Sequence, residues 1–348
     1  MRAAVYHEFE GPITVTDVPE PKPGPDEVVL RVMATGICRS DWHGWKGHDA
    51  DIRSLPHVPG HEMAGEIAEV GIEVTGWEPG DRVTIPFVAG CGRCATCQAG
   101  DPQVCPNQSQ PGFTHWGSFA ELAVIRYAEH NLVRLPDDID YVSAAALGCR
   151  FATAYRAVVQ QGRLKPDEWV AVYGCGGVGS SAVMIAASLG ARVIAVDTNP
   201  EALELAMALG AQTTVDAQGD ITARVIEASD GGTHLGIDAL GSSTLVRQSM
   251  GALRRRGRHV QVGLLVGEDS PTPLHLDRVV AYELEVIGSH GIARASFPEI
   301  FDLVLNSGID LSALVNHEVT LDQGAHRLQT FDEHREPGVA VISSFVAG

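Results

Sequence analysis

The pattern of apolar and polar positions divides the chain into three stretches. Up to about residue 124, short apolar runs are separated by Gly and Pro, which predicts strands joined by loops. From about residue 169 to 289, strand-like apolar runs alternate with helical runs, which predicts a parallel, doubly wound sheet. From about residue 297 the pattern is mixed again, and we expect this segment to pack back on the first stretch.

The first two stretches supply identifiable elements. The strands expected in the first stretch are residues 27–33, 66–70, 82–85 and 119–124. In the second stretch we expect the strand 169–173, an Ala-rich helix ending near residue 189, the strand 192–196 and the helix 200–209, followed by strands at 235–239, 259–262 and 284–287. The fold class predicted from this order is α/β.

Composition narrows the classes of function. The chain has 348 residues, which is long for one core, so we expect two domains. Its net charge of −19 argues against nucleic acid or an anionic membrane surface as a partner. No apolar run is long enough for a membrane span, and the N-terminal residues lack the apolar core of a signal peptide. We therefore expect a cytoplasmic protein that contacts neither membrane nor nucleic acid.

Four of the seven cysteines fall in one short run with the spacing C-x2-C-x2-C-x7-C: Cys91, Cys94, Cys97 and Cys105. Four clustered thiolates can enclose one Zn²⁺ as a closed tetrahedral site. A ferredoxin-type iron–sulfur run has a similar spacing and a proline after its last cysteine, as Pro106 is here, but a shorter final gap. Unrelated buried or paired cysteines are the third interpretation, and the pattern alone leaves all three open.

A glycine run follows the predicted strand 169–173 and opens a helix: Gly174-Cys175-Gly176-Gly177-Val178-Gly179. In this context G-x-G-x-x-G is typical of a dinucleotide-binding turn, because its glycines allow a tight turn and a close approach to a pyrophosphate. Asp197 ends the next strand, where a carboxylate accepts ribose hydroxyls and repels a 2′-phosphate, which favours NAD over NADP. A glycine turn in an unrelated α/β fold is the alternative.

Further candidate ligands are scattered along the chain. They include Cys38, His61 and Cys149, and two cysteines with one histidine are a ligand set of catalytic zinc with one open position. Each residue also has a plainer interpretation, since a lone cysteine is commonly a small buried apolar residue and a lone histidine a hydrogen-bonded scaffold residue.

The order of these motifs resembles the zinc-dependent medium-chain alcohol dehydrogenase family over nearly the whole chain. The order is Cys38, Gly60-His61-Glu62, the four-cysteine run, Cys149, the glycine run and Asp197. The resemblance implies a mainly-β GroES-like catalytic domain at 1–149 and 290–348, with a structural zinc lobe at about 90–106. It implies a Rossmann domain for NAD at 150–289. Two zinc ions per chain are implied, a structural one on the four cysteines, in place of an iron–sulfur cluster, and a catalytic one on Cys38, His61 and Cys149.

The resemblance also implies roles for neighbouring residues. Ser40 and His43 resemble the family's proton relay, Asp41 resembles the carboxylate that orients the ligand histidine, and Glu62 resembles a glutamate that can approach the metal. The remaining implied residues are Arg39, Val262 and Gly263 at the cofactor, together with Phe87 and Leu264 in the substrate pocket.

The implied reaction is hydride transfer between a primary or secondary alcohol and NAD, with an aldehyde or ketone in reverse and the substrate oxygen on the catalytic zinc. A polyol-type or other specialised zinc dehydrogenase is the alternative, although such relatives usually carry a glutamate where Cys149 stands. A zinc-stabilised binding protein or a zinc-free reductase would lack part of these motifs. We expect a homodimer or homotetramer that pairs through the strands 259–262 and 284–287.

One departure from the family concerns cofactor binding. Relatives often carry an arginine near the C-terminus that contacts the cofactor phosphate, whereas the matching stretch here, residues 336–341, contains none. Either the cofactor binds more weakly or Arg39 carries the pyrophosphate alone.

Overall fold

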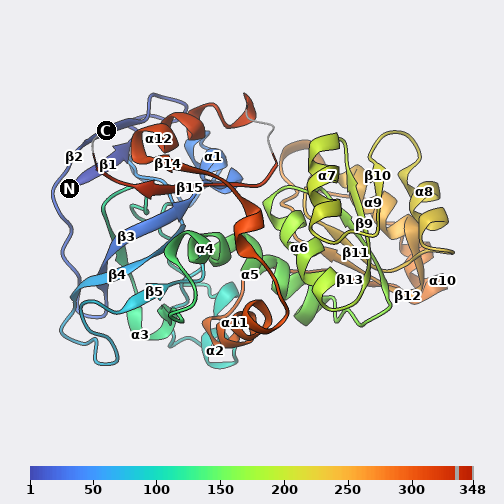
Figure 1. The fold of residues 1–348 in the computed structure, drawn as a ribbon, viewed down its shortest axis with the longest axis horizontal. Coiled ribbons are helices and arrows are strands. Elements are labelled where there is room, and N and C mark those ends of the chain that lie inside the picture. The colour runs from blue at the N-terminus through green and yellow to red at the C-terminus, as the bar shows by residue number, and fades with distance from the viewer. Residues whose placement is uncertain (334–336, 347–348) are drawn as a thin grey trace.

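The computed structural model describes residues 1–333 and 337–346 and has two lobes, each built around one main sheet (Figure 1). Residue 336 of the C-terminal stretch that lacks an arginine lies outside the described residues, whereas residues 337–341 lie within them. Both ends of the described chain lie on the lobe that carries the first sheet (Figure 1).

The first lobe is mainly β. Its sheet has the order β14-β15-β3-β4-β5-β7, with β6 paired to β3. The strands are β3 (Val28–Gly36), β4 (Glu62–Val70), β5 (Arg82–Thr84), β6 (Leu122–Ile125), β7 (Val133–Arg134), β14 (Val315–Thr320) and β15 (Val339–Ser344), beside a two-stranded sheet of β1 (Arg2–Val5) and β2 (Thr14–Asp17). Buried aliphatic residues of β3 and β4, including Leu30, Val32 and Ile67, form the core beneath this sheet.

The second lobe contains an all-parallel sheet with the order β10-β9-β8-β11-β12-β13. Its strands are β8 (Trp169–Tyr173), β9 (Arg192–Asp197), β10 (Thr213–Asp216), β11 (Thr233–Asp238), β12 (Leu253–Gln261) and β13 (Glu285–Gly288). This is the strand order of a doubly wound dinucleotide-binding fold, in which ligands bind beyond the carboxyl ends of the central strands. The predicted α/β class is therefore confirmed.

Helices cover both sheets and join the lobes. They are α1 (Arg39–Trp45), α2 (Ala95–Gln98), α3 (Ala128–Asn131), α4 (Tyr141–Ala146), α5 (Ala152–Tyr155), α6 (Gly177–Ser188), α7 (Pro200–Ala208), α8 (Ile221–Ala228), α9 (Ser243–Ala252), α10 (Leu276–Tyr282), α11 (Phe297–Asn306) and α12 (Leu321–Gln329). No helix among the described residues is long and apolar enough to cross a membrane.

A continuous helical run, which the sequence analysis did not anticipate, links the two lobes. It begins after Asp140, whose carboxylate accepts a hydrogen bond from Ser143 N at 2.9 Å and so caps α4. Between α4 and α5 the backbone widens into a π-helical turn at Leu147–Phe151. Such turns displace side chains from the regular helical pattern and are frequent at functional sites. Here the turn carries Cys149.

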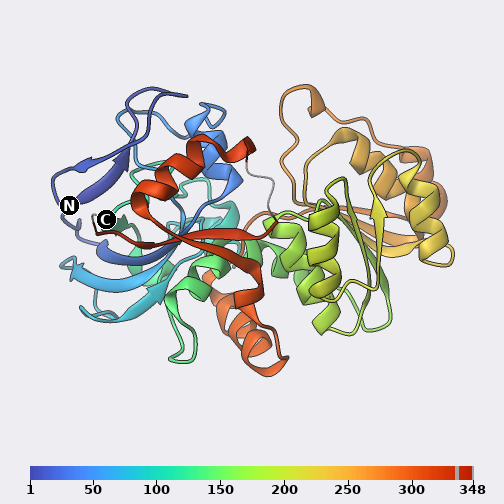
Figure 2. The same cartoon turned by 45° about the horizontal axis from the view of Figure 1, so that its top comes forward.

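The chain returns to the first lobe after completing the second sheet. β15 pairs antiparallel with β3 through Val341 and Gly36, and β14 pairs parallel with β15. In Figure 2 these C-terminal strands lie across the first lobe beside the N-terminal segments. The first sheet is therefore built from both ends of the described chain.

The structure corrects one expectation about assembly. Of the two strands proposed for pairing between subunits, residues 259–262 overlap β12, which lies between β11 and β13 and has no free edge. Of these two strands, β13 (Glu285–Gly288) is the one that lies at an edge of the sheet; β10 forms the opposite edge. The sequence pattern located both strands but not their order in the sheet.

Candidate active site

Three separate elements bring Cys38, His61 and Cys149 together. Cys38 precedes α1, His61 precedes β4, and Cys149 lies in the π-helical turn. With Glu62 included, one possible ligand atom from each residue lies within 4.8 Å of the others, and all four residues are buried. The positions predicted as catalytic metal ligands therefore form one cluster.

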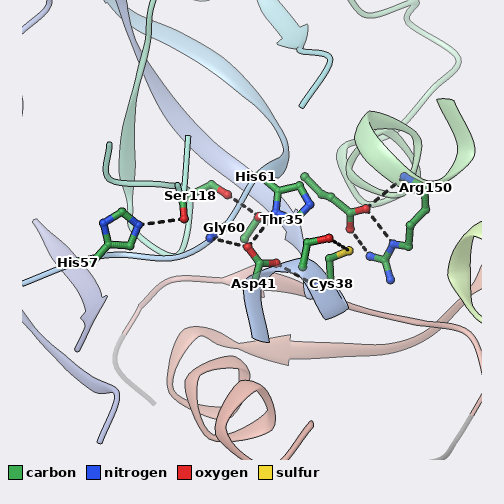
Figure 3. Close-up of polar contacts among 11 residues, drawn as sticks. Thr35, Cys38, Asp41, His57, Gly60, His61, Ser118 and Arg150 are labelled. Carbon is green, nitrogen blue, oxygen red and sulfur yellow. Dashed lines mark hydrogen bonds and ion pairs between the residues drawn. The ribbon is translucent and has the colours of Figure 1, made fainter. Parts of the chain in front are cut away.

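Asp41 holds this cluster in place through three hydrogen bonds. Its Oδ1 lies 2.8 Å from His61 Nδ1 and accepts from Gly60 N at 3.0 Å, while its Oδ2 accepts from Cys38 N at 3.0 Å. Figure 3 shows Asp41 between Gly60 and Cys38, with the ring of His61 beside it. A carboxylate only accepts, so His61 Nδ1 carries the proton. Asp41 thereby fixes both the tautomer and the direction of the imidazole.

The other ring nitrogen of His61 fits a metal ligand. Nε2 is buried and has no hydrogen-bond partner among the described residues. Since Asp41 keeps a proton on Nδ1, Nε2 is the ring nitrogen that can give its lone pair to a metal. An unpaired buried polar atom is costly, and a soft divalent cation bound by sulfur and nitrogen would remove that cost.

The protonation of the two thiols is coupled. A hydrogen bond from Cys149, together with nearby His61, holds the pKa of Cys38 well below its usual range. The same bond and burial raise the pKa of Cys149. Burial opposes a charged His61, but the adjacent Asp41 outweighs it and raises the pKa of His61. Metal binding would displace the protons that these thiols and the imidazole hold.

A buried arginine that sequence reasoning missed completes the cluster. Arg150 Nε donates to Glu62 Oε1 at 2.8 Å, and Nη2 donates to Glu62 Oε2. Burial raises the pKa of Glu62 to about 7, and the charge of Arg150 opposes that increase. The available signal was a charged residue directly after Cys149 in an otherwise apolar, Ala-rich segment.

The four remaining predicted ligands form a second cluster beside α2: Cys91, Cys94, Cys97 and Cys105. Cys105 Sγ lies 3.6 Å from Cys91 Sγ and 3.7 Å from Cys94 Sγ. A tetrahedral zinc with Zn–S bonds near 2.3 Å would place its sulfurs about 3.8 Å apart. All seven cysteines of the chain are free thiols. The spacing of the cluster therefore fits one structural zinc.

The residues predicted for proton transfer lie on α1. Ser40 Oγ is 3.8 Å from Cys38 Sγ. His43 Nδ1 lies 3.1 Å from Nδ1 of the exposed His48, so one of the two nitrogens carries a proton. Burial, and secondarily Arg39, lower the pKa of His43. His43 is therefore neutral at pH 7 and can accept a proton.

Arg39 does not contact the glycine turn in the described structure. Its guanidinium lies 3.7 Å from Asp332 and packs over the rings of Trp42 and Phe331. The side chain is half-exposed. Its predicted contact with a pyrophosphate stays a prediction.

The glycine run forms the turn between β8 and α6. Gly174 has a φ of +87°, and a Cβ added at Gly179 would lie 1.8 Å from Gly174 O, so the turn requires glycine at both positions. Gly176, Gly177 and Val178 form the start of α6, where free N–H groups favour an anion. These features fit the pyrophosphate of a dinucleotide.

Asp197 ends β9 beside this turn. Its Oδ2 accepts from Cys175 N at 2.6 Å and its Oδ1 from Asn199 N at 2.8 Å, so the carboxylate is held at the carboxyl edge of the sheet. Val262 and Gly263 follow β12 at the same edge, and both donate their N–H to Asp238 O. The predicted cofactor residues of the second lobe thus lie at strand ends where a nucleotide would bind.

Of the predicted pocket residues, one lies at the metal cluster and one does not. The rings of Phe87 and His61 are 6.0 Å apart, and Phe113, which was not predicted, lies 5.2 Å from the same imidazole. Leu264 is 64% exposed, beyond Gly263 on the second lobe. Apolar rings therefore border the imidazole, while Leu264 has no described contact with the ligands.

Comparisons with known proteins agree with this geometry. Residues 24–137 match the alcohol dehydrogenase GroES-like domain, and residues 177–306 match the zinc-binding dehydrogenase domain. An alcohol dehydrogenase of Geobacillus stearothermophilus is 38% identical over 290 residues, which cover 83% of this chain and 84% of that protein.

Solved structures give the same result over nearly the full length. A structure described as an NAD-dependent alcohol dehydrogenase superposes with a TM-score of 0.85 at 30% identity, covering 98% of this chain and 99% of the other. The alcohol dehydrogenase of Aeropyrum pernix superposes with a TM-score of 0.87 at 33% identity, with the same coverage. Because matched domains, strand order and metal-ligand clusters coincide, the chain belongs to the zinc-dependent medium-chain alcohol dehydrogenase family and is an oxidoreductase.

Proposed function

We propose that this enzyme transfers a hydride between a primary or secondary alcohol and NAD, with an aldehyde or ketone as the other partner. The observation that carries the proposal is the buried Cys38–His61–Cys149 cluster with an unpartnered His61 Nε2. When bound, zinc would supply a Lewis acid for the substrate oxygen, and NAD would accept the hydride.

The chain's own residues position the reactants and move the proton. Cys38, His61 and Cys149 would hold the catalytic zinc, and Asp41 keeps the imidazole in its ligating tautomer. Ser40 would take the proton of the alcohol, and His43 would receive it, since its lowered pKa keeps the ring neutral near pH 7. Phe87 and Phe113 would exclude water beside His61.

The choice of NAD rests on Asp197. Its carboxylate is fixed by two backbone N–H groups at the end of β9 and would accept the ribose hydroxyls. A 2′-phosphate would meet the same negative charge at short range, which disfavours NADP. Gly176–Gly179 would bind the pyrophosphate, and Val262 and Gly263 would contact the cofactor from β12.

The proposal extends to organisation and assembly. We assign the catalytic domain to 1–149 and 290–348 and the cofactor domain to 150–289. We propose a cytoplasmic homodimer or homotetramer that pairs along the free edge of β13. A monomer mass near 37.0 kDa by light scattering at assay concentration would contradict that assembly.

An alcohol panel tests the reaction directly. Purified enzyme is given NAD and a series of primary alcohols, secondary alcohols and polyols, and NADH absorbance is followed with and without a chelator. We expect turnover of simple alcohols that the chelator abolishes and zinc restores. Turnover of polyols alone would favour the polyol-type alternative, and chelator-resistant turnover would contradict zinc catalysis.

A further inference from the structure

Arg150 is a charged side chain in an almost fully buried position between the two lobes. The residue is 6% exposed. Its backbone N and its Nε donate to Glu62 Oε1 at 3.3 Å and 2.8 Å, and Nη2 donates to Glu62 Oε2. One edge of the guanidinium thus forms a fork-like, two-point contact with the carboxylate next to His61. Figure 3 shows Arg150 at the far side of the metal cluster from His57.

The stem of the same side chain lies on the glycine turn. A Cβ added at Gly177 would come within 2.2 Å of Arg150 Cδ and 3.3 Å of Nε, so the arginine occupies the space that any side chain there would need. On the first lobe, a Cβ added at Gly36 would lie 2.7 Å from Arg150 Nη2. Two glycines, one from each lobe, therefore leave room for this arginine.

One nitrogen of the Arg150 guanidinium has no hydrogen-bond partner among the described residues. Nη1 makes no hydrogen bond with the described residues and is not among the fully buried unpaired atoms. Meanwhile Arg39 is engaged with Asp332, and residues 337–341 contain no arginine. Within the described chain, Arg150 is thus a cation that contacts the start of α6 and still has a donor available.

We propose that Arg150 is a cofactor-positioning residue, which binds Glu62 with Nε and Nη2 and donates through Nη1 to the cofactor's pyrophosphate at the start of α6. This inference rests on the proposed use of a dinucleotide. Arginine suits both tasks at once, because its planar fork offers separate donors to a carboxylate and a phosphate, which the single ammonium of lysine does not.

The structure also predicts a link between the metal-ligand cluster and the pyrophosphate site at the start of α6. Glu62 offers an oxygen within 4.8 Å of the ligand atoms of the cluster. If the fork is removed, the Glu62 carboxylate loses its cation and becomes free to approach a metal on Cys38, His61 and Cys149. A change in metal coordination should therefore accompany the loss of phosphate affinity.

Binding measurements separate this role from a purely structural one. Dissociation constants are measured for NADH by fluorescence, and for ADP-ribose and adenosine by competition, in the wild type, Arg150→Lys and Arg150→Gln. Loss of a charge-assisted hydrogen bond to phosphate should raise the dissociation constants of ADP-ribose and NADH by about 10- to 100-fold. Adenosine lacks the pyrophosphate, so its dissociation constant should change by less than about threefold.

A double variant and a matched control keep the test decisive. Arg150→Gln combined with Glu62→Gln leaves no unpaired buried charge, so it guards against misfolding, and the same selective loss of ADP-ribose is expected there. Arg134→Lys changes a half-exposed arginine on β7 that pairs with Asp81, and should leave all three affinities unchanged. In Co²⁺-substituted protein, Arg150→Gln should shift the visible spectrum, and the double variant should restore it.

The outcome that overturns the proposal is an unchanged ratio of ADP-ribose to adenosine affinity in folded, zinc-loaded variants. A wild type that binds no ADP-ribose would overturn both this inference and the use of a dinucleotide. Selective ADP-ribose loss in an enzyme that oxidises no alcohol would support Arg150 and contradict only the proposed reaction.

Discussion

Replacing Asp41 with Asn should loosen the catalytic metal site without greatly changing its shape. Asp41 is 1% exposed and accepts from Cys38 N, Gly60 N and His61 Nδ1. Asparagine has one accepting oxygen and one donating NH₂ group. Whichever way the amide is turned, the NH₂ group faces at least one of these three donors. At least one buried donor is then left without an acceptor.

The expected magnitude follows from that count. One buried, unsatisfied donor costs about 1–3 kcal/mol in the free energy of unfolding. The imidazole also loses the negative charge that orients it, and removal of such a partner lowers metal affinity by about 10- to 100-fold. In free energy of zinc binding this is about 1.4–2.8 kcal/mol.

Competition with a chromophoric chelator measures the loss directly. We expect Asp41→Asn to release one zinc per chain more readily, while the zinc on the four cysteines is retained. The control is Asp140→Asn, because Asp140 caps α4 through a hydrogen bond from Ser143 N and asparagine caps equally well. If Asp41→Asn bound the zinc on Cys38, His61 and Cys149 as tightly as the wild type, Asp41 would not be the group that orients His61.

Three further outcomes follow from the site. Metal analysis should find two zinc ions per chain, with the one on Cys38, His61 and Cys149 chelated first because its fourth position is open; one zinc, or iron, would contradict this. Asp197→Ser should narrow the preference for NAD over NADP in kcat/KM, whereas a wild type that favours NADP would contradict the role of Asp197. His43→Gln should lower alcohol oxidation about 10- to 1000-fold near neutral pH and recover partly at high pH, where hydroxide or buffer accepts the proton. In the wild type, proton transfer through His43 should fail only below the lowered pKa of His43, where the ring becomes protonated. A loss of activity in His43→Gln that does not depend on pH would contradict the relay.

The fold was predictable where a local pattern determines structure. The strand predicted at 169–173 is β8, and the glycine turn and Asp197 follow it as expected, because strand, turn and helix are adjacent in sequence. β12 begins at Leu253 rather than near residue 259, since Arg254–Arg256 hide the apolar pattern of its first half. The helical run from Tyr141 was missed although Asp140 and the alanines after it are helix signals.

The site was harder to predict, because its parts come from distant segments. No periodicity connects Cys38, His61 and Cys149, so only the family resemblance grouped them. The resemblance indicated Asp41, but the contacts of Asp41 and Arg150 depend on distances that spacing does not encode. Arg150 in particular looks like a surface charge in the sequence, and only the packing of Gly36 and Gly177 around it shows a buried position.

The return of the chain to its first sheet has a consequence for biosynthesis. Val341 pairs with Gly36, and Ile37 N donates to Ala340 O at 2.9 Å, so the end of β3 that leads to Cys38 is paired by β15. At 5–20 residues per second, β15 is made about 15–60 s after β3. The second sheet and the four-cysteine lobe are each contiguous and can form during that interval. During synthesis on the ribosome, we therefore expect the structural zinc to bind before the catalytic one. The catalytic site includes Cys38, and the strand end that leads to Cys38 is paired only after β15 has been made.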